Sequence, residues 1–239
     1  MKIRRLAILP LLPLMLAGCG LDSLGLENEG LSTRVRFMNA SPGSPALTLF
    51  LNERPVVTQV PYGEVSAYIA LEPALYSIRM GTYGDQSEAS TASLVSGTFR
   101  PIAGVSYTLF AAGPGEAPQA MLAVDTGVVP SAGKVKVRAI NAAPSAPPID
   151  VHLVTWGRSP EESTRLLTPF MFGAGASHDH TGYVERDADR YHLVVTFEGT
   201  ADILLDVSPM ELAAGQARTI VILDGSDGEL FARVVADRH

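Results

Sequence analysis

The chain contains a single cysteine, Cys19, among its 239 residues. An intramolecular disulfide needs two thiols, so core packing, hydrogen bonds and ion pairs must hold the fold. Long apolar runs are also missing. The N-terminal run, Leu6 to Gly18, has 13 residues, whereas a membrane-spanning helix needs about 20. Pro10 and Pro13 interrupt this run and each removes a helical hydrogen bond, so the N-terminus is not predicted to be a transmembrane anchor.

Basic residues are scarce as well. The chain has 18 Lys and Arg against 25 Asp and Glu, a net charge of −7. Residues 1–18 hold three of the cations and no acid, so a chain that begins at Cys19 has 15 cations, 25 acids and a net charge of −10. Such a surface repels phosphate backbones and anionic headgroups, so we expect no nucleic-acid partner.

The N-terminus has the parts of an export signal. A basic segment, Lys2 to Arg5, precedes the apolar run, and Leu16-Ala17-Gly18-Cys19 closes it with small residues and a thiol. This order resembles a bacterial lipoprotein signal peptide. The resemblance implies that residues 1–18 are removed and that Cys19 is acylated, with palmitate among the chains. Two or three acyl chains make a lasting membrane anchor.

The residues after Cys19 predict the cellular location of the protein and a flexible tether. Gly20 stands where an aspartate would be the inner-membrane retention signal, so the resemblance favours the outer membrane of a bacterial cell envelope. Residues 19–33 are rich in glycine and acids, which predicts a flexible lipidated tether. Thirteen flexible residues reach about 20 Å root-mean-square, so the folded part is expected near the bilayer.

The rest of the chain is an internal repeat. Arg34–Leu51 aligns without a gap to Lys136–Leu153 at an offset of 102, with seven of 18 positions identical. Unrelated segments would match at about one position, so duplication is the better explanation. Tyr68 and Tyr183 continue the match at an offset of 115. The turn-rich segment 130–133 separates the copies, which predicts domains at 34–130 and 134–239.

Both copies are predicted to be β structure. Ile149, Val151 and Leu153 alternate with polar residues, the period of a half-buried strand, and 17 prolines with 22 glycines fit many short strands. The predicted fold is therefore all-β, with two tandem immunoglobulin-like antiparallel β-sandwich domains after the signal peptide. Leu71 to Tyr76 resembles a tyrosine corner, in which a phenol bonds to nearby backbone. Closure into a barrel is the alternative.

The opening motif of each copy resembles a known family. Val35-Arg36-Phe37-Met38-Asn39-Ala40-Ser41-Pro42 and its counterpart Val137 to Pro144 are similar to the signature of the domain of unknown function 4397. The resemblance covers nearly all of residues 34–239 and implies an exported or cell-envelope protein, often with repeated domains. The family has no agreed activity, so it transfers no functional residues.

The shared asparagines have two interpretations. An asparagine and a proline in a loop can build a ligand site. They can also fix a turn, because Asn accepts from backbone donors two residues on and proline sets the chain leaving the strand. Occurrence at one place in both copies favours the turn.

Copy two carries 13 extra residues between Val154 and Gly182. Loops bind ligands more often than the strands beneath them, so this segment is the candidate ligand-binding region. Its aromatic residues are Trp156 (the only tryptophan), Phe170 and Phe172. Trp156 is a candidate stacking platform for a sugar or peptide, or else a rim aromatic that covers the end of the sandwich.

His178 and His180 in the same segment are weak metal candidates. On an extended chain they point to one face, but a zinc site needs at least three protein ligands. His152 and His192 are the other histidines available, and both are predicted on solvent-facing strand positions. A solvated polar loop is the competing interpretation, and no metal or other cofactor is predicted.

Catalytic templates are missing from the sequence. Gly175-Ala176-Ser177-His178-Asp179 lacks the last glycine of a nucleophile elbow, and no glycine loop precedes a helix. We therefore predict a non-catalytic binding or structural module, anchored through the lipid on Cys19, with an envelope protein or glycan as partner. The alternative is a metal- or carboxylate-dependent envelope hydrolase centred on the insertion in copy two.

Overall fold

The computed structural model describes residues 33–83, 93–115, 117–125, 129–160, 163–174, 176, 182–225 and 227–237. No α-helix occurs among them, and nearly all of the regular structure is β-strand. The signal peptide expected at 1–18 and residues 19–32 of the expected tether lie outside the described residues, whereas Thr33, predicted as the end of the tether, is buried and begins the first strand. The strands of the N-terminal half are β1 Thr33–Ala40, β2 Leu47–Leu51, β3 Arg54–Val60, β4 Ile69–Leu71, β5 Tyr76–Gly81, β6 Ser93–Phe99, β7 Ser106–Ala112 and β8 Gln119–Val124.

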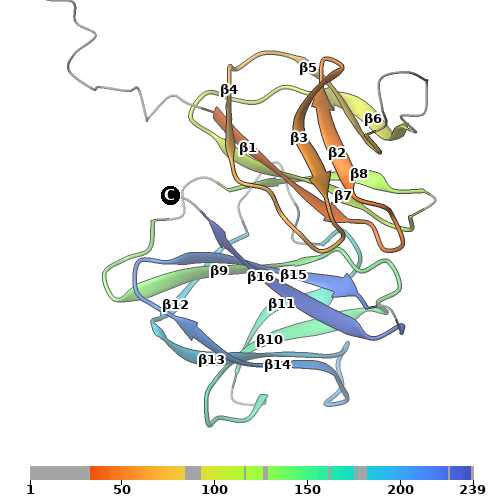
Figure 1. Cartoon of the computed structure of the whole chain (residues 1–239). Helices are drawn as coiled ribbons and strands as arrows, with labels where there is room; N and C mark the ends of the chain where they lie inside the picture. The colour runs from red at the N-terminus through yellow and green to blue at the C-terminus, as the bar shows by residue number, and fades with distance from the viewer. Residues whose placement is uncertain are drawn as a thin grey trace, which may run out of the picture.

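The C-terminal half repeats this series after a connection at 125–133. Its strands are β9 Lys134–Asn141, β10 Ile149–Thr155, β11 Thr164–Phe170, β12 Val184–Asp187, β13 Asp189–Phe197, β14 Ile203–Leu212, β15 Ala217–Asp224 and β16 Leu230–Asp237. Each half therefore contributes eight strands, and Figure 1 shows the two groups one above the other.

Both halves have one strand order. The inner sheets are β4-β1-β7-β8 and β12-β9-β15-β16, and the outer sheets are β3-β2-β5-β6 and β11-β10-β13-β14. Most neighbouring strands are antiparallel, but β1 pairs with β7 and β9 with β15 in parallel. This order differs from the ABED and CFG sheets of an immunoglobulin constant domain. The likeness to that fold is thus limited to two packed sheets per half.

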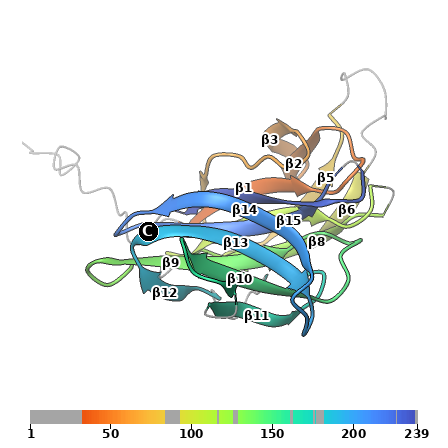
Figure 2. The same ribbon diagram turned by 90° about the horizontal axis from the view of Figure 1, so that it is seen from below.

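Each half encloses its own hydrophobic core between its inner and outer sheet. The core of the N-terminal half is built from residues of 35–124, and that of the C-terminal half from residues of 135–232. Ile149, Val151 and Leu153 all lie in the second core, as their spacing predicts. Seen from below in Figure 2, β13 and β14 pass in front of the inner strand β15.

The other face of β10 is also buried, which corrects an expectation from the sequence. His152 was predicted to face solvent, yet it is buried, and so is Asp150 two residues before it. Asp150 accepts a hydrogen bond from the backbone N–H of Gly199 at 3.0 Å and pairs with Arg165 at 3.3 Å. Ser163, Arg165 and the turn at Gly199 cover this face of β10, because Ser163 contacts His152 and the other two contact Asp150.

The tyrosine corner predicted at Tyr76 is confirmed, and Tyr191 forms the same contact in the C-terminal half. The hydroxyl of Tyr76 donates to the carbonyl oxygen of Glu72 at 2.9 Å, and Tyr191 donates to Asp187 at 2.9 Å. Tyr191 makes this bond without the proline that precedes Tyr76 by three residues. The spacing of four residues back along the chain, and not the proline, therefore defines the motif here.

The asparagine turn is confirmed as well. Asn39 and Asn141 are fully buried. Their side-chain oxygens accept from the backbone N–H two residues on, Ser41 at 3.2 Å and Ala143 at 3.0 Å. Asn39 also donates to the carbonyl of Val60 at 3.1 Å, so it ties the first strand to the end of β3. Its hydrogen-bonding groups are engaged within the fold, so the ligand-site interpretation loses its basis.

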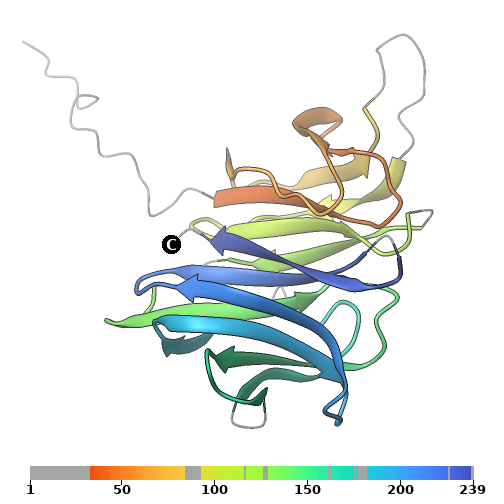
Figure 3. The same ribbon diagram turned by 60° about the horizontal axis from the view of Figure 1, so that its bottom comes forward.

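A third apolar cluster joins the halves. It contains side chains from the inner sheets of both, so the two inner sheets pack face to face (Figure 3). We call this contact the interface; its buried members are Met38, Ala40, Phe110, Ala112, Ala123, Ile140, Ala142, Val221, Leu223 and Val235.

The 13 extra residues of the C-terminal half divide between two places. Leu47 pairs with Val60 in the N-terminal half, and Ile149 pairs with Phe170 in the C-terminal half. The sequence offset is 102 between the first members of these pairs and 110 between the second members, so the β10–β11 hairpin is longer by eight residues. The backbone bonds from Gly63 to Asn39 and from Gly173 to Asn141 keep the offset of 110. The remaining difference arises before Tyr183. The segment predicted as one insertion is thus a longer hairpin plus a second, shorter addition.

Candidate functional site

Two arginine side chains cross the interface and donate hydrogen bonds to the opposite half. Arg36 on β1 donates to Asp237 Oδ1 at 2.5 Å and to the carbonyl of Ala236 at 2.8 Å, both at the end of β16. Its Nε donates to the hydroxyl of Thr108 at 2.8 Å within its own half. One side chain therefore joins the N-terminal half to the last strand of the C-terminal half.

Arg138 on β9 makes the same three contacts in the opposite direction. It pairs with Asp125, donates to the carbonyl of Val124 at 2.6 Å, and donates through Nε to Thr219 at 2.8 Å. Thr108 in turn donates to Asp125 at 2.6 Å, and Thr219 to Asp237 at 2.8 Å. The set repeats with pseudo-two-fold symmetry. We call these residues the ion cluster: Arg36, Thr108, Asp125, Arg138, Thr219 and Asp237.

The carboxylates of the cluster favour the charged form of Arg36 and the neutral form of the adjacent Tyr68. Burial alone would lower the pKa of Arg36, but the carboxylates of Asp125 and Asp237 outweigh burial and raise it. Tyr68 lies against Arg36, whose guanidinium carbon is 4.6 Å from the ring centroid, and donates to Asp125 at 2.7 Å. Burial and then Asp125 raise the pKa of Tyr68, so it stays a neutral donor.

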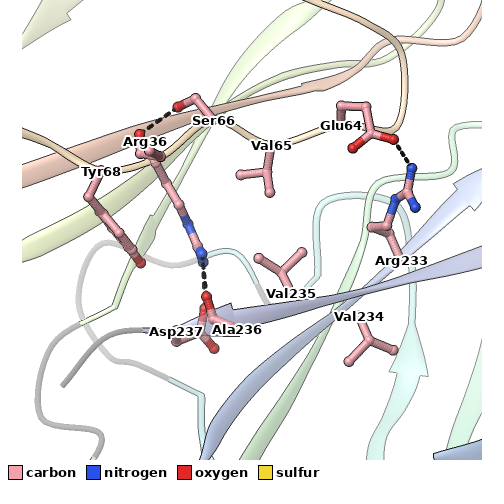
Figure 4. A pocket seen from close by; sticks show the side chains of 11 residues that line it. Arg36, Glu64, Val65, Ser66, Tyr68, Arg233, Val234, Val235, Ala236 and Asp237 are labelled. Carbon is pink, nitrogen blue, oxygen red and sulfur yellow. Dashed lines mark hydrogen bonds and ion pairs between the residues drawn. The ribbon is translucent and has the colours of Figure 1, made fainter.

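Beside the ion cluster lies a groove of 520 Å³ between the halves, shown in Figure 4. One wall is the segment 64–68 of the N-terminal half, and the other is β16. Arg233 on β16 pairs with Glu64 and donates to the carbonyl of Gly63 at 2.9 Å across the groove. The cations that line the groove therefore have partners within the protein. This arrangement holds the halves together and presents no free cation for an anionic ligand.

Trp156, predicted as a ligand anchor, lies apart from this groove at the start of the long hairpin. Its side chain is 49% exposed. The ring meets His192 edge-on at a centroid distance of 6.0 Å, and Arg190 stacks over it at 4.7 Å. Half of the ring thus packs on β13 while the other half faces solvent, a geometry that suits both the rim and the platform interpretation.

Phe172, another predicted residue, packs in a different part of the fold from Trp156. Phe172 is partly buried against the interface cluster, where it takes the place that Tyr62 has in the N-terminal half. Phe170 belongs to β11, opposite Ile149. His178 and His180 lie outside the described residues. Within the part of the chain that is described, no three His, Cys, Asp or Glu side chains converge as metal ligands.

A serine and a histidine do meet in the long hairpin. Ser163 Oγ lies 3.0 Å from Nδ1 of His152 and donates to the carbonyl of Pro160 at 2.5 Å. The hydroxyl has one proton and gives it to Pro160, so Nδ1 of His152 must act as the donor to Oγ. A general base would have to accept that proton instead. The contact therefore stabilises the hairpin and does not activate a nucleophile.

The buried His152 predicts acid sensitivity. Burial, and then Arg165, lower its pKa below the ordinary 6.5, against the opposing effect of Asp150. The unfolded chain then binds more protons, so the stability that neutral His152 contributes is complete above pH 6.5 and declines as the pH falls toward the folded pKa.

Phe50 is the matching residue of the N-terminal half. We expect His152→Phe to flatten the fall in unfolding free energy between about pH 7 and pH 5, measured by urea unfolding. An equally steep fall in the variant would contradict this.

The ion cluster was not predicted, although traces of it are in the sequence. Arg36 and Arg138 are an identical pair of the repeat, and Thr108 and Thr219 match at an offset of 111. Asp125 and Asp237 match at 112, but the residues around them differ. The repeat could therefore have identified the six residues, but it could not have indicated that each arginine pairs with the aspartate of the other half.

A family model decides the relationship of this chain. The family described as a domain of unknown function (DUF4397) matches residues 33–152. The chain belongs to this family. The match covers the N-terminal half, the connection and the strands β9 and most of β10 of the C-terminal half. It therefore includes both copies of the asparagine turn and both arginines of the ion cluster.

Other comparisons add little. No curated protein matches the chain. Among solved structures it is similar to the C-terminal domain of AlgF from P. aeruginosa, with 19% identity over 44% of this chain and 97% of that one, at a TM-score of 0.25. The Bacillus anthracis TIE protein gives 8% identity over 81% of this chain and 34% of that one, at a TM-score of 0.24. TM-scores this low support no argument about function.

Across the described residues, no helix is long and apolar enough to cross a lipid bilayer.

Proposed function

We propose that this chain is a lipid-anchored, non-catalytic binding or structural module of the bacterial cell envelope. It is anchored through the acylated Cys19 and is located at the outer membrane. The folded part consists of two tandem copies of the family domain, at 34–130 and 134–239, each a β-sandwich. The partner is an envelope protein or glycan.

The reciprocal ion cluster is the observation that carries this proposal. A hydrolase that closes over a substrate needs a cleft whose walls can move. Here the two halves are joined through four buried charged side chains, Arg36, Asp125, Arg138 and Asp237. Separating the halves would expose buried ion pairs and the apolar interface together. A rigid two-part body of this kind suits presentation of a surface more than it suits turnover.

The identical strand order of the halves supports duplication. The tyrosine corner, the asparagine turn and the arginine contacts recur at matching positions in both. Duplication followed by divergence explains why the offset between the halves changes along the chain, from 102 at Leu51/Leu153 to 115 at Tyr68/Tyr183 and 111 at Thr108/Thr219. The exposed face of Trp156 on the longer hairpin is then the first surface to test for a partner.

Replacing the acylated cysteine tests the anchor. We expect Cys19→Ala to leave an unprocessed precursor that has no lipid and separates from the outer-membrane fraction. The measurement is fractionation with labelled palmitate, with mobility compared on a gel. Ser32→Ala, at the far end of the same segment, is the matched control and should behave like the wild type. Equal processing and equal labelling of the Cys19 variant would refute the anchor.

Capture of partners from cross-linked envelopes tests the binding role. The wild type should retain an envelope protein or glycan that Trp156→Ala releases. The ring is half exposed, so this change should leave the melting temperature nearly unchanged. A clear fall in melting temperature would instead identify Trp156 as a packing residue.

A further inference from the structure

One end of the molecule gathers the chain segments that lead in and out of both halves. Thr33, the first described residue, begins β1 there, and Asp237 ends β16 beside it, as Figures 1 and 3 show. The pair Arg36–Asp237 joins these two strands directly. The pair Arg138–Asp125 brings the connection between the halves to the same end. We call this the tether end, because the segment predicted as a tether precedes Thr33.

The two most exposed large apolar side chains among the described residues lie at the tether end. Val129 in the connection is 68% exposed and Ile102 in the β6–β7 loop is 65% exposed. The carbonyl of Ile102 accepts a hydrogen bond from Thr33 at 2.7 Å, so this loop touches the point where the chain enters the fold. Single exposed aliphatic residues are common, but two at the same end of the molecule, where the chain enters the fold, offer an apolar contact to a partner surface.

Charge is distributed unevenly between the two ends. The loops 41–46, 142–148, 198–202 and 225–229 at the opposite end contain no Lys or Arg. At the tether end, Arg34 and Arg100 flank the Ile102 loop, and neither has an ion-pair partner among the described residues. These four loops contain four acids and no cation, whereas at the tether end two cations stand beside the apolar tips.

We propose that the tether end docks on a phospholipid bilayer. Ile102 and Val129 enter the interfacial region, while Arg34 and Arg100 meet lipid phosphates. The acidic loops of the opposite end then face away from the membrane. The tether makes weak docking sufficient, because a short flexible linker gives an effective concentration of about millimolar. The native tether rests on the proposed acylation of Cys19, but the docking face stands on its own observations.

A chemical anchor separates this proposal from native acylation. The chain has one thiol, so protein that begins at Cys19 can be coupled to a maleimide lipid in vesicles of phosphatidylglycerol and phosphatidylcholine. Hydrogen exchange is then compared between coupled and free protein. We expect the amides of 100–105 and 129–133 to exchange about fivefold more slowly on vesicles, with 198–202 unchanged.

A pair of double variants gives the matched control. Ile102→Asp with Val129→Asp should abolish the slowing, because a carboxylate at either tip opposes entry into lipid. Phe197→Asp with Ile203→Asp, two exposed apolar residues of the opposite end (41% and 55% exposed), should retain it. Arg34→Ser with Arg100→Ser should remove any preference for phosphatidylglycerol.

Equal exchange of coupled and free wild type, or slowing at 198–202, would overturn the docking face. Slowing on vesicles together with normal processing of Cys19→Ala in cells would uphold the docking face and reject the anchor.

Discussion

Asp125→Ala is expected to lower the free energy of unfolding by about 3–5 kcal/mol, the cost of leaving a buried charge without its partner. The carboxylate pairs with Arg138 and also accepts from Thr108 and Tyr68. The alanine variant leaves a guanidinium and two hydroxyls short of an acceptor in a buried site. The measurement is urea unfolding, compared at equal m-values.

Two further aspartates calibrate that result. Asp237→Ala, the counterpart in the pseudo-symmetric arrangement, removes the partner of Arg36 and should also be costly. Asp187→Ala removes an exposed pair with Lys134 and should leave the free energy of unfolding nearly unchanged. If Asp125→Ala proves as mild as Asp187→Ala, the ion cluster does not hold the halves together. The proposal of one rigid body would fail with it.

Leu153→Ala is expected to cost about 2–5 kcal/mol, because it leaves a cavity in the core of the C-terminal half. No disulfide constrains the unfolded chain, so the loss should appear in full as a lower melting temperature. The change should not affect the ion cluster, since Leu153 lies in the core and not at the interface. A loss well below this range would mean that the site collapses around the smaller side chain.

The alternation of β10 predicts that Asp150 faces solvent and that its replacement has little effect on stability, which is wrong. It is buried and serves as acceptor for the N–H of Gly199, so Asp150→Ala should cost about 1–3 kcal/mol. Glu198→Ala, exposed on the adjoining turn, is the appropriate surface control and should change stability by about 0.5 kcal/mol or less. Equal effects of Asp150→Ala and Glu198→Ala would show that the buried bond contributes nothing.

The local features could be predicted because their causes are local. Alternating side chains on one strand define which residues can share a core, and Ile149, Val151 and Leu153 follow that rule. The bond from Tyr76 to a carbonyl four residues back spans one turn of chain. The bond from Asn39 to an amide two residues on spans even less. In each case the interacting atoms are neighbours along the backbone, so residue type and spacing were sufficient.

Predictions that depended on neighbouring strands were less successful. His152 alternates like a solvent-facing residue, but a central strand of a sheet can be covered on both faces. Phe172 stood out as an extra aromatic residue of a loop, but it packs into the interface as the counterpart of Tyr62. The count of 13 additional residues was right, but strand pairing was needed to divide them between two places.

The sequence alone determined that the chain is a duplicated all-β protein, because the repeat and the strand period are properties of residue order. It also supplied the whole argument for export, since that motif is read along the chain. Tertiary structure decided which surfaces the two copies share. Arg36 and Arg138 are identical in the repeat, which does not say which aspartate each one binds: Arg36 lies 3.8 Å from Asp125 of its own half but donates directly to Asp237 of the other half. Only the face-to-face packing of the inner sheets places each guanidinium against the other half's carboxylate. The two pairs are separated by about 200 positions (Arg36–Asp237) and by 13 positions (Arg138–Asp125), so no common spacing in the sequence indicates them.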